Sequence, residues 1–315
     1  MDESVTIDAI IKNLLIENDA FFNHVYVINQ EFDIIPSEKH YGMAINYVDI
    51  QESREQFVRE LINTVIDWVY SQAKQQYILS ELHDESRTIA NAYTELQQKA
   101  FDKFRPSNDG DLIHGQFGEL LLANCLQRFF RAVPILRKMP ITTSVKHERF
   151  GSDAIHYKTE NDKDIFYIGE AKSYTSPYKF NTAFAESLES ILKEYNDIQR
   201  ELRSYMYEEF IDKELIQITK DLINGKLPNA EFRLVTIIAY DETMQKNGTT
   251  REEMLQSINT IISKRFSDFD KDKINIAKYP ILNRITYMVF PVWEFEKLIK
   301  DFSQNIPNQK SKDKS

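Results

Sequence analysis

The chain has 315 residues, and its 20 phenylalanines and 16 tyrosines are enough to form a large core, which excludes disorder as its main state. It has only 8 glycines, against roughly 22 at the average usage of about 7%, so folds built on many glycine turns are not expected. Taken alone, the formal net charge of −10 argues against a nucleic-acid binder, because nucleic-acid-binding domains are commonly basic.

The first predicted elements lie in an acidic N-terminal stretch. Residues Met1–Ile50 carry nine acidic and two basic side chains. Within them, strands are predicted at Val25–Ile28 and Phe32–Ile35. Apolar residues then recur at helical spacing over Phe57–Val69, which predicts a helix, and a second, polar helix is predicted at Ser80–Phe104.

A cluster of residues that break helices and strands divides the chain near residue 108. The run Arg105–Asp111 contains a proline and the sequence Asn-Asp-Gly, and the apolar periodicity stops there. We therefore predict an N-terminal region at residues 1–108 with a partner-docking or regulatory role. A main domain is predicted at residues 109–303, and a polar tail at 304–315.

The main domain is predicted to alternate helices and strands in the order α-β-β-β-α-α-β-α-β. This order predicts an α/β fold, a mixed sheet flanked by helices. The predicted elements are a helix at Leu112–Arg131, strands at Ile141–Val145, Asp153–Thr159 and Ile165–Ser173, helices at Phe180–Arg203 and Met206–Asn224 (the latter capped by Gly225), a strand at Phe232–Tyr240, a helix from a capping box at Thr250 to Phe266, and a strand at Ile285–Phe290 stopped by Pro291.

The second and third strands of this domain are joined by a polar turn and form a predicted hairpin. If Asn161-Asp162 is a two-residue turn, Asp153 lies directly opposite Glu170. Side chains alternate between the two faces of a strand. Asp153, Glu170 and Lys172 therefore share one face of the hairpin, which is otherwise apolar.

This arrangement indicates a metal site. Two facing carboxylates repel each other and are costly at the end of an apolar face, and a bound Mg²⁺ or Mn²⁺ removes both penalties. Lys172 is then placed to stabilise phosphate charge or to help deprotonate an attacking water. Glu119 lies on the apolar stripe of the preceding helix. It either completes the metal site, orients Lys172, or caps the helix or pairs with an arginine.

The set Glu119, Asp153 and Glu170-x-Lys172 resembles the PD-(D/E)XK nuclease superfamily. The dipeptide Gly151-Ser152 before the aspartate replaces the usual Pro-Asp pattern. The resemblance implies a restriction-endonuclease-like core with an N-terminal α/β extension. It also implies that Asp153 and Glu170 hold the metal together with the carbonyl of Ala171.

A closer similarity is to the HamA family, the nuclease subunits of the bacterial Hachiman anti-phage defence system. It implies a metal-dependent DNA endonuclease, with Mg²⁺ as cofactor and Mn²⁺ as a substitute, that works with a helicase partner, HamB. The chain has no Gly-x4-Gly-Lys-Ser/Thr phosphate loop of its own. The similarity covers roughly Leu112–Leu298 and rests on the segments His114-Gly115-Gln116-Phe117-Gly118-Glu119, Gly151-Ser152-Asp153-Ala154 and Gly169-Glu170-Ala171-Lys172-Ser173.

Two alternatives to a DNA nuclease stay open. One is a nuclease-like scaffold that binds a partner or nucleic acid without cutting it, and the other is a nuclease directed at RNA. The N-terminus lacks the basic and apolar segments of a signal peptide, and Cys125 is the only cysteine. No run of 18 apolar residues is present. These features predict a cytoplasmic protein without membrane association.

Charge is distributed unevenly along the chain. Met1–Ile50 has a net charge of −7, whereas Leu120–Phe150 has a net charge of +5. The basic segment is either a solvated face or a flank that contacts phosphates. We therefore expect weak DNA binding by the chain alone and delivery of DNA by a partner. Candidate DNA contacts are Arg128, Arg131, Lys146 and Arg149, together with Ser173 and Tyr174.

Overall fold

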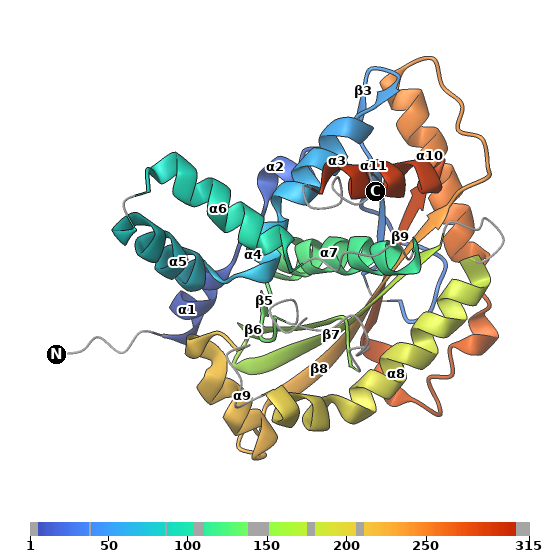
Figure 1. The fold of residues 1–315 in the computed structure, drawn as a ribbon. Coiled ribbons are helices and arrows are strands. Elements are labelled where there is room, and N and C mark those ends of the chain that lie inside the picture. Colours follow the sequence, from blue (N-terminus) through green and yellow to red (C-terminus); the bar gives the residue numbers. More distant parts are fainter. Residues whose placement is uncertain are drawn as a thin grey trace.

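The computed structural model describes residues 6–37, 39–85, 87–103, 110–137, 151–174, 180–205 and 211–306. These residues form one seven-stranded mixed sheet with helices on both faces (Figure 1). The predicted α/β class, a mixed sheet flanked by helices, is therefore confirmed. The strands, in spatial order, are β1 (Val25–Ile28), β2 (Tyr41–Ile45), β9 (Ile285–Val292), β8 (Ala230–Asp241), β7 (Lys163–Tyr174), β6 (Ala154–Glu160) and β5 (Val133–Pro134).

Both faces of the sheet are covered because the central strands are apolar on both sides. On one face Ala154, Tyr167 and Val235 contribute to the core, and on the other face Ile155 and Ile168 do so. The helices of the first face are α2 (Asp19–Phe22), α3 (Arg54–Asn63), α4 (Val65–Val69), α5 (Gln72–Asp84), α6 (Ile89–Phe101), α7 (Gly110–Phe130) and α11 (Phe295–Asn305). Those of the second face are α1 (Ile7–Leu14), α8 (Phe180–Tyr205), α9 (Ile216–Ile223) and α10 (Arg251–Ser267).

The hairpin of β6 and β7 has the predicted register. Ala154 pairs with Gly169 and Glu160 pairs with Lys163, which leaves Asn161 and Asp162 as the two turn residues. Both have positive φ, 52° and 60°. That is the backbone of a type I′ turn, which matches the twist of the strands it joins.

Two predicted helix ends are also confirmed. Gly225 adopts φ 65° after α9, and its N–H donates to the carbonyl of Leu222 at 3.1 Å. At the start of α10 the Thr250 hydroxyl accepts from the backbone N–H of Glu253 at 3.2 Å. The Glu253 carboxylate accepts from the N–H of Thr249 at 2.7 Å. The capping box is therefore present, but the Glu253 carboxylate accepts from the N–H of Thr249 instead of that of the N-cap residue, Thr250.

Three predictions in the N-terminal region are wrong in detail. Phe32–Ile35 is not a strand, because the partner of β1 is the fully buried β2 and Phe32 instead stacks on a phenylalanine of α10. The polar helix predicted to run to residue 104 is two helices, α5 and α6, since the Thr88 hydroxyl caps a new N-terminus at α6. The helix over residues 57–69 is likewise divided, into α3 and α4, at Thr64.

Two predictions in the second half are also corrected. Of the helix predicted at Met206–Asn224, the first five residues lie outside the described residues. The described part has a bridge between Ile211 and Leu136 and a 3₁₀ turn at Lys213–Leu215, and the α-helix α9 begins at Ile216. β9 continues through Pro291 to Val292. A proline is tolerated there because the pairing of β2 with β9 ends at Val289. No backbone N–H is therefore needed from Pro291 on the edge that faces β2.

One predicted strand, residues 141–145, lies outside the described residues. The strand that pairs with β6 on its outer side is β5, which was not predicted. It is only two residues long and contains a proline, so no alternation marks it.

The sheet is continuous across the boundary predicted near residue 108. β2, from the N-terminal region, pairs in parallel with β9, near the other end of the chain. A two-stranded hairpin, β3 (Tyr47–Val48) and β4 (Gln51–Glu52), leads from β2 to α3, which packs against α11. The α5–α6 hairpin projects from this body (Figure 1). No helix in the described ranges is both long enough and apolar enough to cross a membrane.

Candidate active site

The candidate site lies where β7 extends past the end of β6. β6 begins at Ala154, opposite Gly169, whereas β7 continues to Tyr174 while still paired with β8. Asp153 is the residue immediately before β6 and therefore stands at this open edge. Its Oδ2 accepts the backbone N–H of Ala171 at 2.8 Å, so the carboxylate occupies the position where a further strand residue would pair.

Glu170 and Lys172 lie two residues apart on β7 and project to the same face, as predicted. The Lys172 ammonium is 2.8 Å from Glu170 Oε1. The Glu170 side chain is 5% exposed and that of Lys172 is 27% exposed. The glutamate is thus inside the protein, and the lysine reaches from it toward solvent.

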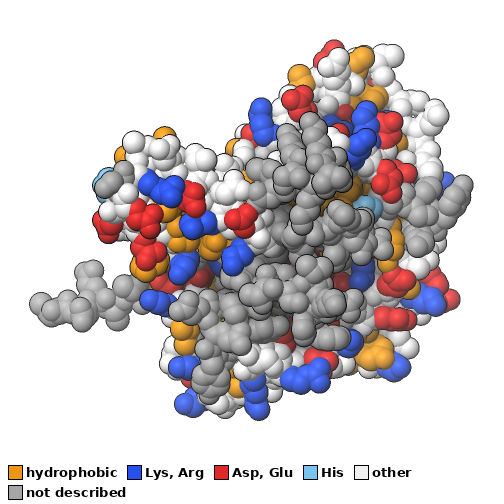
Figure 2. Space-filling model, in the orientation of Figure 1, with side chains coloured by type: hydrophobic (Ala, Val, Ile, Leu, Met, Phe, Trp, Pro, Cys, Tyr) orange, Lys and Arg blue, Asp and Glu red, His pale blue; other side chains and the backbone are white. Residues whose placement is uncertain are grey.

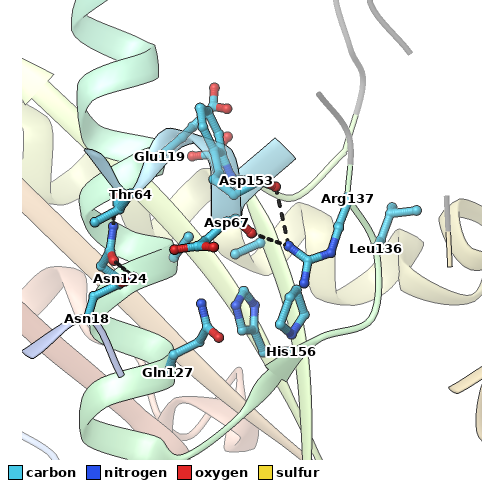
Figure 3. Close-up of a pocket in the computed structure, with 14 residues that line it drawn as sticks. Asn18, Thr64, Asp67, Glu119, Asn124, Gln127, Leu136, Arg137, Asp153 and His156 are labelled. Atoms are coloured by element: carbon cyan, nitrogen blue, oxygen red, sulfur yellow. Dashed lines mark hydrogen bonds between the residues drawn. The ribbon is translucent and has the colours of Figure 1, made fainter. Parts of the chain in front are cut away.

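Glu119 is brought to the same edge from α7, because glycines let this helix lie close to β7. A Cβ atom at Gly118 would lie 2.6 Å from the Ser173 hydroxyl, and one at Gly169 would lie 2.9 Å from Leu122. Larger side chains at either glycine would push the helix away from the strand. Glu119 and Asp153 line one small polar cavity beside the sheet edge (Figure 3).

The electrostatics of the site are dominated by three carboxylates. Burial raises the pKa of Asp153 well above its usual value, and the charges of Glu170 and Glu119 raise it further. The N–H of Ala171 and the charge of Lys172 oppose this rise without cancelling it. Burial lowers the pKa of Lys172, but its attraction to Glu170 and Asp153 outweighs burial and raises the pKa overall. The sequence prediction that these four side chains cluster therefore agrees with the electrostatics.

The donor set of this cluster suits a hard divalent cation. Asp153 and Glu170 supply carboxylate oxygens, the ligand type that Mg²⁺ and Mn²⁺ prefer. In a strand the N–H and C=O of one residue point to the same edge. The carbonyl of Ala171 therefore faces the edge where its N–H meets Asp153. Across the described ranges, no three His, Cys, Asp or Glu side chains are gathered closely enough to form a complete metal centre. The ligand types therefore suit Mg²⁺ or Mn²⁺, but the described side chains do not form a complete coordination sphere.

Two of the predicted DNA contacts, Arg128 and Arg131, lie apart from the carboxylates. Arg128 is nine residues beyond Glu119 on α7, about 13 Å along the helix, and it pairs with Glu17 at 3.2 Å and with Asp19. Arg131 also pairs with Glu17. The acidic N-terminal stretch thus neutralises two arginines of the basic segment.

The other predicted DNA contacts have different surroundings. Residues Lys146 and Arg149 lie outside the described residues. Ser173 faces α7 at Gly118, and the Tyr174 hydroxyl donates to Glu186 of α8. Among the predicted DNA contacts that the structure describes, Ser173 and Tyr174 are therefore the two that lie next to the carboxylate cluster. On the visible face of the described residues, acidic and basic side chains are intermixed over the α5–α6 hairpin (Figure 2).

Arg137 belongs to the basic segment Leu120–Phe150, but the structure buries it inside the protein. It is 7% exposed, and its guanidinium donates to the backbone carbonyl of Asp67 at 2.5 Å. Its Nε lies 3.5 Å from the carboxylate of Asp212. These partners are about 70 residues away along the chain on either side, so no local pattern could have identified them.

The remaining candidates fit structural roles. Cys125 is fully buried, 3.8 Å from the sulfur of Met43, and burial raises the pKa of its thiol. His156 is also buried, in the cavity of about 20 Å³ shown in Figure 3. Burial, and then the charge of Arg137, lower the pKa of His156 to about 3, so its imidazole is neutral. By the alternation along β6, the side chain of His156 lies on the opposite face of the strand from Ile155.

Comparison with protein families gives one match. A family model described as HamA matches residues 19–306, a span that includes all four residues of the carboxylate cluster. A search among curated proteins found no match for the chain.

Proposed function

The chain belongs to the HamA family, which is associated with Hachiman anti-phage defence, and we propose that it is a metal-dependent deoxyribonuclease. The observation that carries the proposal is the convergence of Asp153, Glu170 and Glu119 with Lys172 at the open edge of β7. Like charges are expensive to bury together. Their concentration beside a lysine at a sheet edge is explained by a cation and a phosphate that bind there.

Each residue has a proposed role in phosphodiester hydrolysis. Asp153 and Glu170, with the carbonyl of Ala171, would hold Mg²⁺, or Mn²⁺ in its place. A divalent ion supplies Lewis-acid polarisation of a phosphate and lowers the pKa of bound water. Lys172 stabilises the negative charge that develops on the phosphate, because its ammonium extends from the buried Glu170 toward solvent. Glu119 would support the metal or Lys172, because its negative charge beside Asp153 adds to the attraction for a cation.

A partner that delivers DNA is the second part of the proposal. The family implies a helicase, HamB, and the chain has a net charge of −10 and no phosphate-binding loop. Two arginines of its basic segment are already paired with acidic residues. Weak intrinsic DNA binding is therefore expected. The cytoplasmic location expected from the sequence remains a prediction.

The test is cleavage of supercoiled and linear DNA in Mg²⁺ by the purified chain, alone and with the helicase. Lys172→Ala should reduce cleavage by about 100- to 1,000-fold through lost stabilisation of the transition state. Lys163→Ala is the matched control, since Lys163 lies at the other end of β7 in an ion pair with Glu231. Activity that persists unchanged in Lys172→Ala or Asp153→Ala would contradict the proposal.

The alternative function is a nuclease-like scaffold without catalytic activity. It is favoured by the observation that the described side chains do not form a complete metal site. Titration with Mn²⁺ separates the two. Uptake by the native chain that is lost in Asp153→Ala supports the nuclease, whereas no uptake supports the scaffold. Competition between DNA and RNA substrates decides which nucleic acid is cut.

A further inference from the structure

Ser152, the residue that precedes Asp153, is bound by a glutamate of α8. Ser152 is fully buried, and both its backbone N–H and its hydroxyl donate to Glu201 Oε2, at 3.1 and 3.0 Å. Glu201 lies near the C-terminal end of α8 and is only 8% exposed. A buried carboxylate that accepts two bonds from one residue fixes the backbone of that residue firmly.

Gly151 shows that this contact is closely fitted. Its φ is 127°, a conformation that side chains other than glycine rarely adopt. A Cβ atom at this position would also collide with the carboxylate of Glu201. Glycine is therefore required here for two independent reasons, and both maintain the same contact between the loop and α8.

The position of Asp153 follows from this contact. Its backbone continues directly from the bound Ser152, and its Oδ2 accepts the N–H of Ala171 across the strand edge. Asp153 is thus held from both sides, by α8 through the loop and by β7 through its own side chain. Without the first restraint, the bond to Ala171 would be the hydrogen bond that remains, within the described part of the chain, to keep Asp153 at the edge.

We infer that Glu201 is a positioning residue, which holds Asp153 at the open edge of β7 through Ser152. The positioning itself is a matter of geometry, and only its consequence for cleavage rests on the proposed nuclease function. Glu201 does not need to touch metal or substrate. It acts on the aspartate as an outer partner acts on a metal ligand, and loss of such partners reduces metal affinity or activity by about 10- to 100-fold.

The primary measurement is hydrogen exchange at the Ala171 amide in the full-length chain, followed by NMR. Asp153→Ala sets the rate for an amide without its carboxylate partner. Glu201→Ala should move the exchange of Ala171 most of the way to that rate. Glu201→Gln should restore slow exchange, since an amide oxygen still accepts from Ser152. Ser152→Ala, which loses the hydroxyl bond and keeps the N–H bond, should give a smaller increase and provides a second variant if Glu201→Ala does not fold.

Glu194→Ala is the matched control. Glu194 lies one heptad earlier on α8 and is also 8% exposed, so its loss disturbs the same helix without removing the contact to Ser152. It should leave the Ala171 amide protected. Mn²⁺ affinity, measured by electron paramagnetic resonance, should fall by about 10- to 100-fold in Glu201→Ala and by much less in Glu201→Gln and Glu194→Ala.

The two proposals fail in different ways. If the native chain binds no Mn²⁺ and cuts no DNA, the nuclease function is wrong, and the Ala171 exchange still decides whether Glu201 positions Asp153. If Ala171 exchanges at the native rate in both Glu201→Ala and Ser152→Ala, or if Glu194→Ala exposes it equally, the positioning role is overturned. This holds whatever the level of cleavage.

Discussion

Two regions of this molecule concentrate charge in opposite ways. At the open edge of β7, the carboxylates of Asp153, Glu170 and Glu119 repel one another, and the N–H of Ala171 and the charge of Lys172 offset this repulsion only in part. In the arginine segment, by which we mean Arg128, Arg131 and Arg137, each arginine contacts an acidic residue from elsewhere in the chain. The first region is electrostatically incomplete and the second is satisfied. The difference indicates that the carboxylates serve a ligand and the arginines serve the fold.

The largest effect is expected inside the arginine segment. Arg137→Ala leaves the carbonyl of Asp67 without its donor and the buried carboxylate of Asp212 without its ion-pair partner. The free energy of unfolding should fall by about 3–5 kcal/mol, as measured by urea denaturation. Arg128→Ala is the control, because its pairs are partly exposed, and it should cost at most about 1 kcal/mol. Equal losses in the two variants would show that burial does not separate these arginines.

At the β7 edge, removal of a charge should improve stability and abolish function. Asp153→Asn keeps an acceptor for the Ala171 N–H. It removes a charge whose burial, together with repulsion from Glu170 and Glu119, raises the pKa of Asp153. Without divalent metal, it should raise the free energy of unfolding by about 0.5–2 kcal/mol. Cleavage should fall by at least about 100-fold. Loss of a partner that only orients a metal ligand costs about 10- to 100-fold, and loss of the ligand itself should cost at least as much.

Urea denaturation in EDTA and then in Mg²⁺ provides the check on this prediction. Mg²⁺ should stabilise the native chain and not the variant. A variant that is less stable than the native chain in EDTA would mean that the carboxylates are not in conflict.

The dependence of stability on pH should show His156 as a buried neutral group. Burial and Arg137 lower its folded pKa to about 3, whereas the unfolded value is about 6.5. Between these values the unfolded chain binds a proton that the folded chain does not, so stability falls as the pH falls. This group alone contributes up to about 1.4 kcal/mol per pH unit.

Thermal unfolding of the native chain and of His156→Phe from pH 7.5 to pH 4.5 measures this term. The slope of stability against pH should be shallower in the variant. The raised pKa of Asp153, caused first by burial, has the opposite sign, since it stabilises the fold at low pH. Parallel slopes in the two proteins would show that His156 does not titrate as described.

The smallest expected effect concerns the exposed arginines. Glu17→Gln combined with Asp19→Asn removes the acidic partners of Arg128 and Arg131. If these arginines contact DNA, the affinity for a DNA duplex should rise a few-fold at low salt and less at high salt. Fluorescence anisotropy at two salt concentrations is the measurement. Unchanged affinity would remove both arginines from the DNA-binding surface.

The sequence predicted the register of the β6–β7 hairpin well and the helix boundaries less well. Alternation along β6 and β7 and the Asn161-Asp162 turn gave the register that the structure has. The prediction of a single long helix that ends at residue 104 was wrong, because the Thr88 hydroxyl caps the start of a new helix. The strand β5 had no recognisable pattern at two residues.

The sequence by itself determined the register of the hairpin, in which Ala154 lies opposite Gly169, because a two-residue turn and a period of two fix the pairing within a hairpin. It also determined that Glu170 and Lys172 share one face of β7. Only the tertiary structure decided what surrounds these residues. Glu201 reaches Ser152 across 49 residues, and Arg137 reaches Asp67 across 70. Such contacts depend on how α8 and α4 pack on the sheet, and no spacing within either segment encodes the partner it will meet.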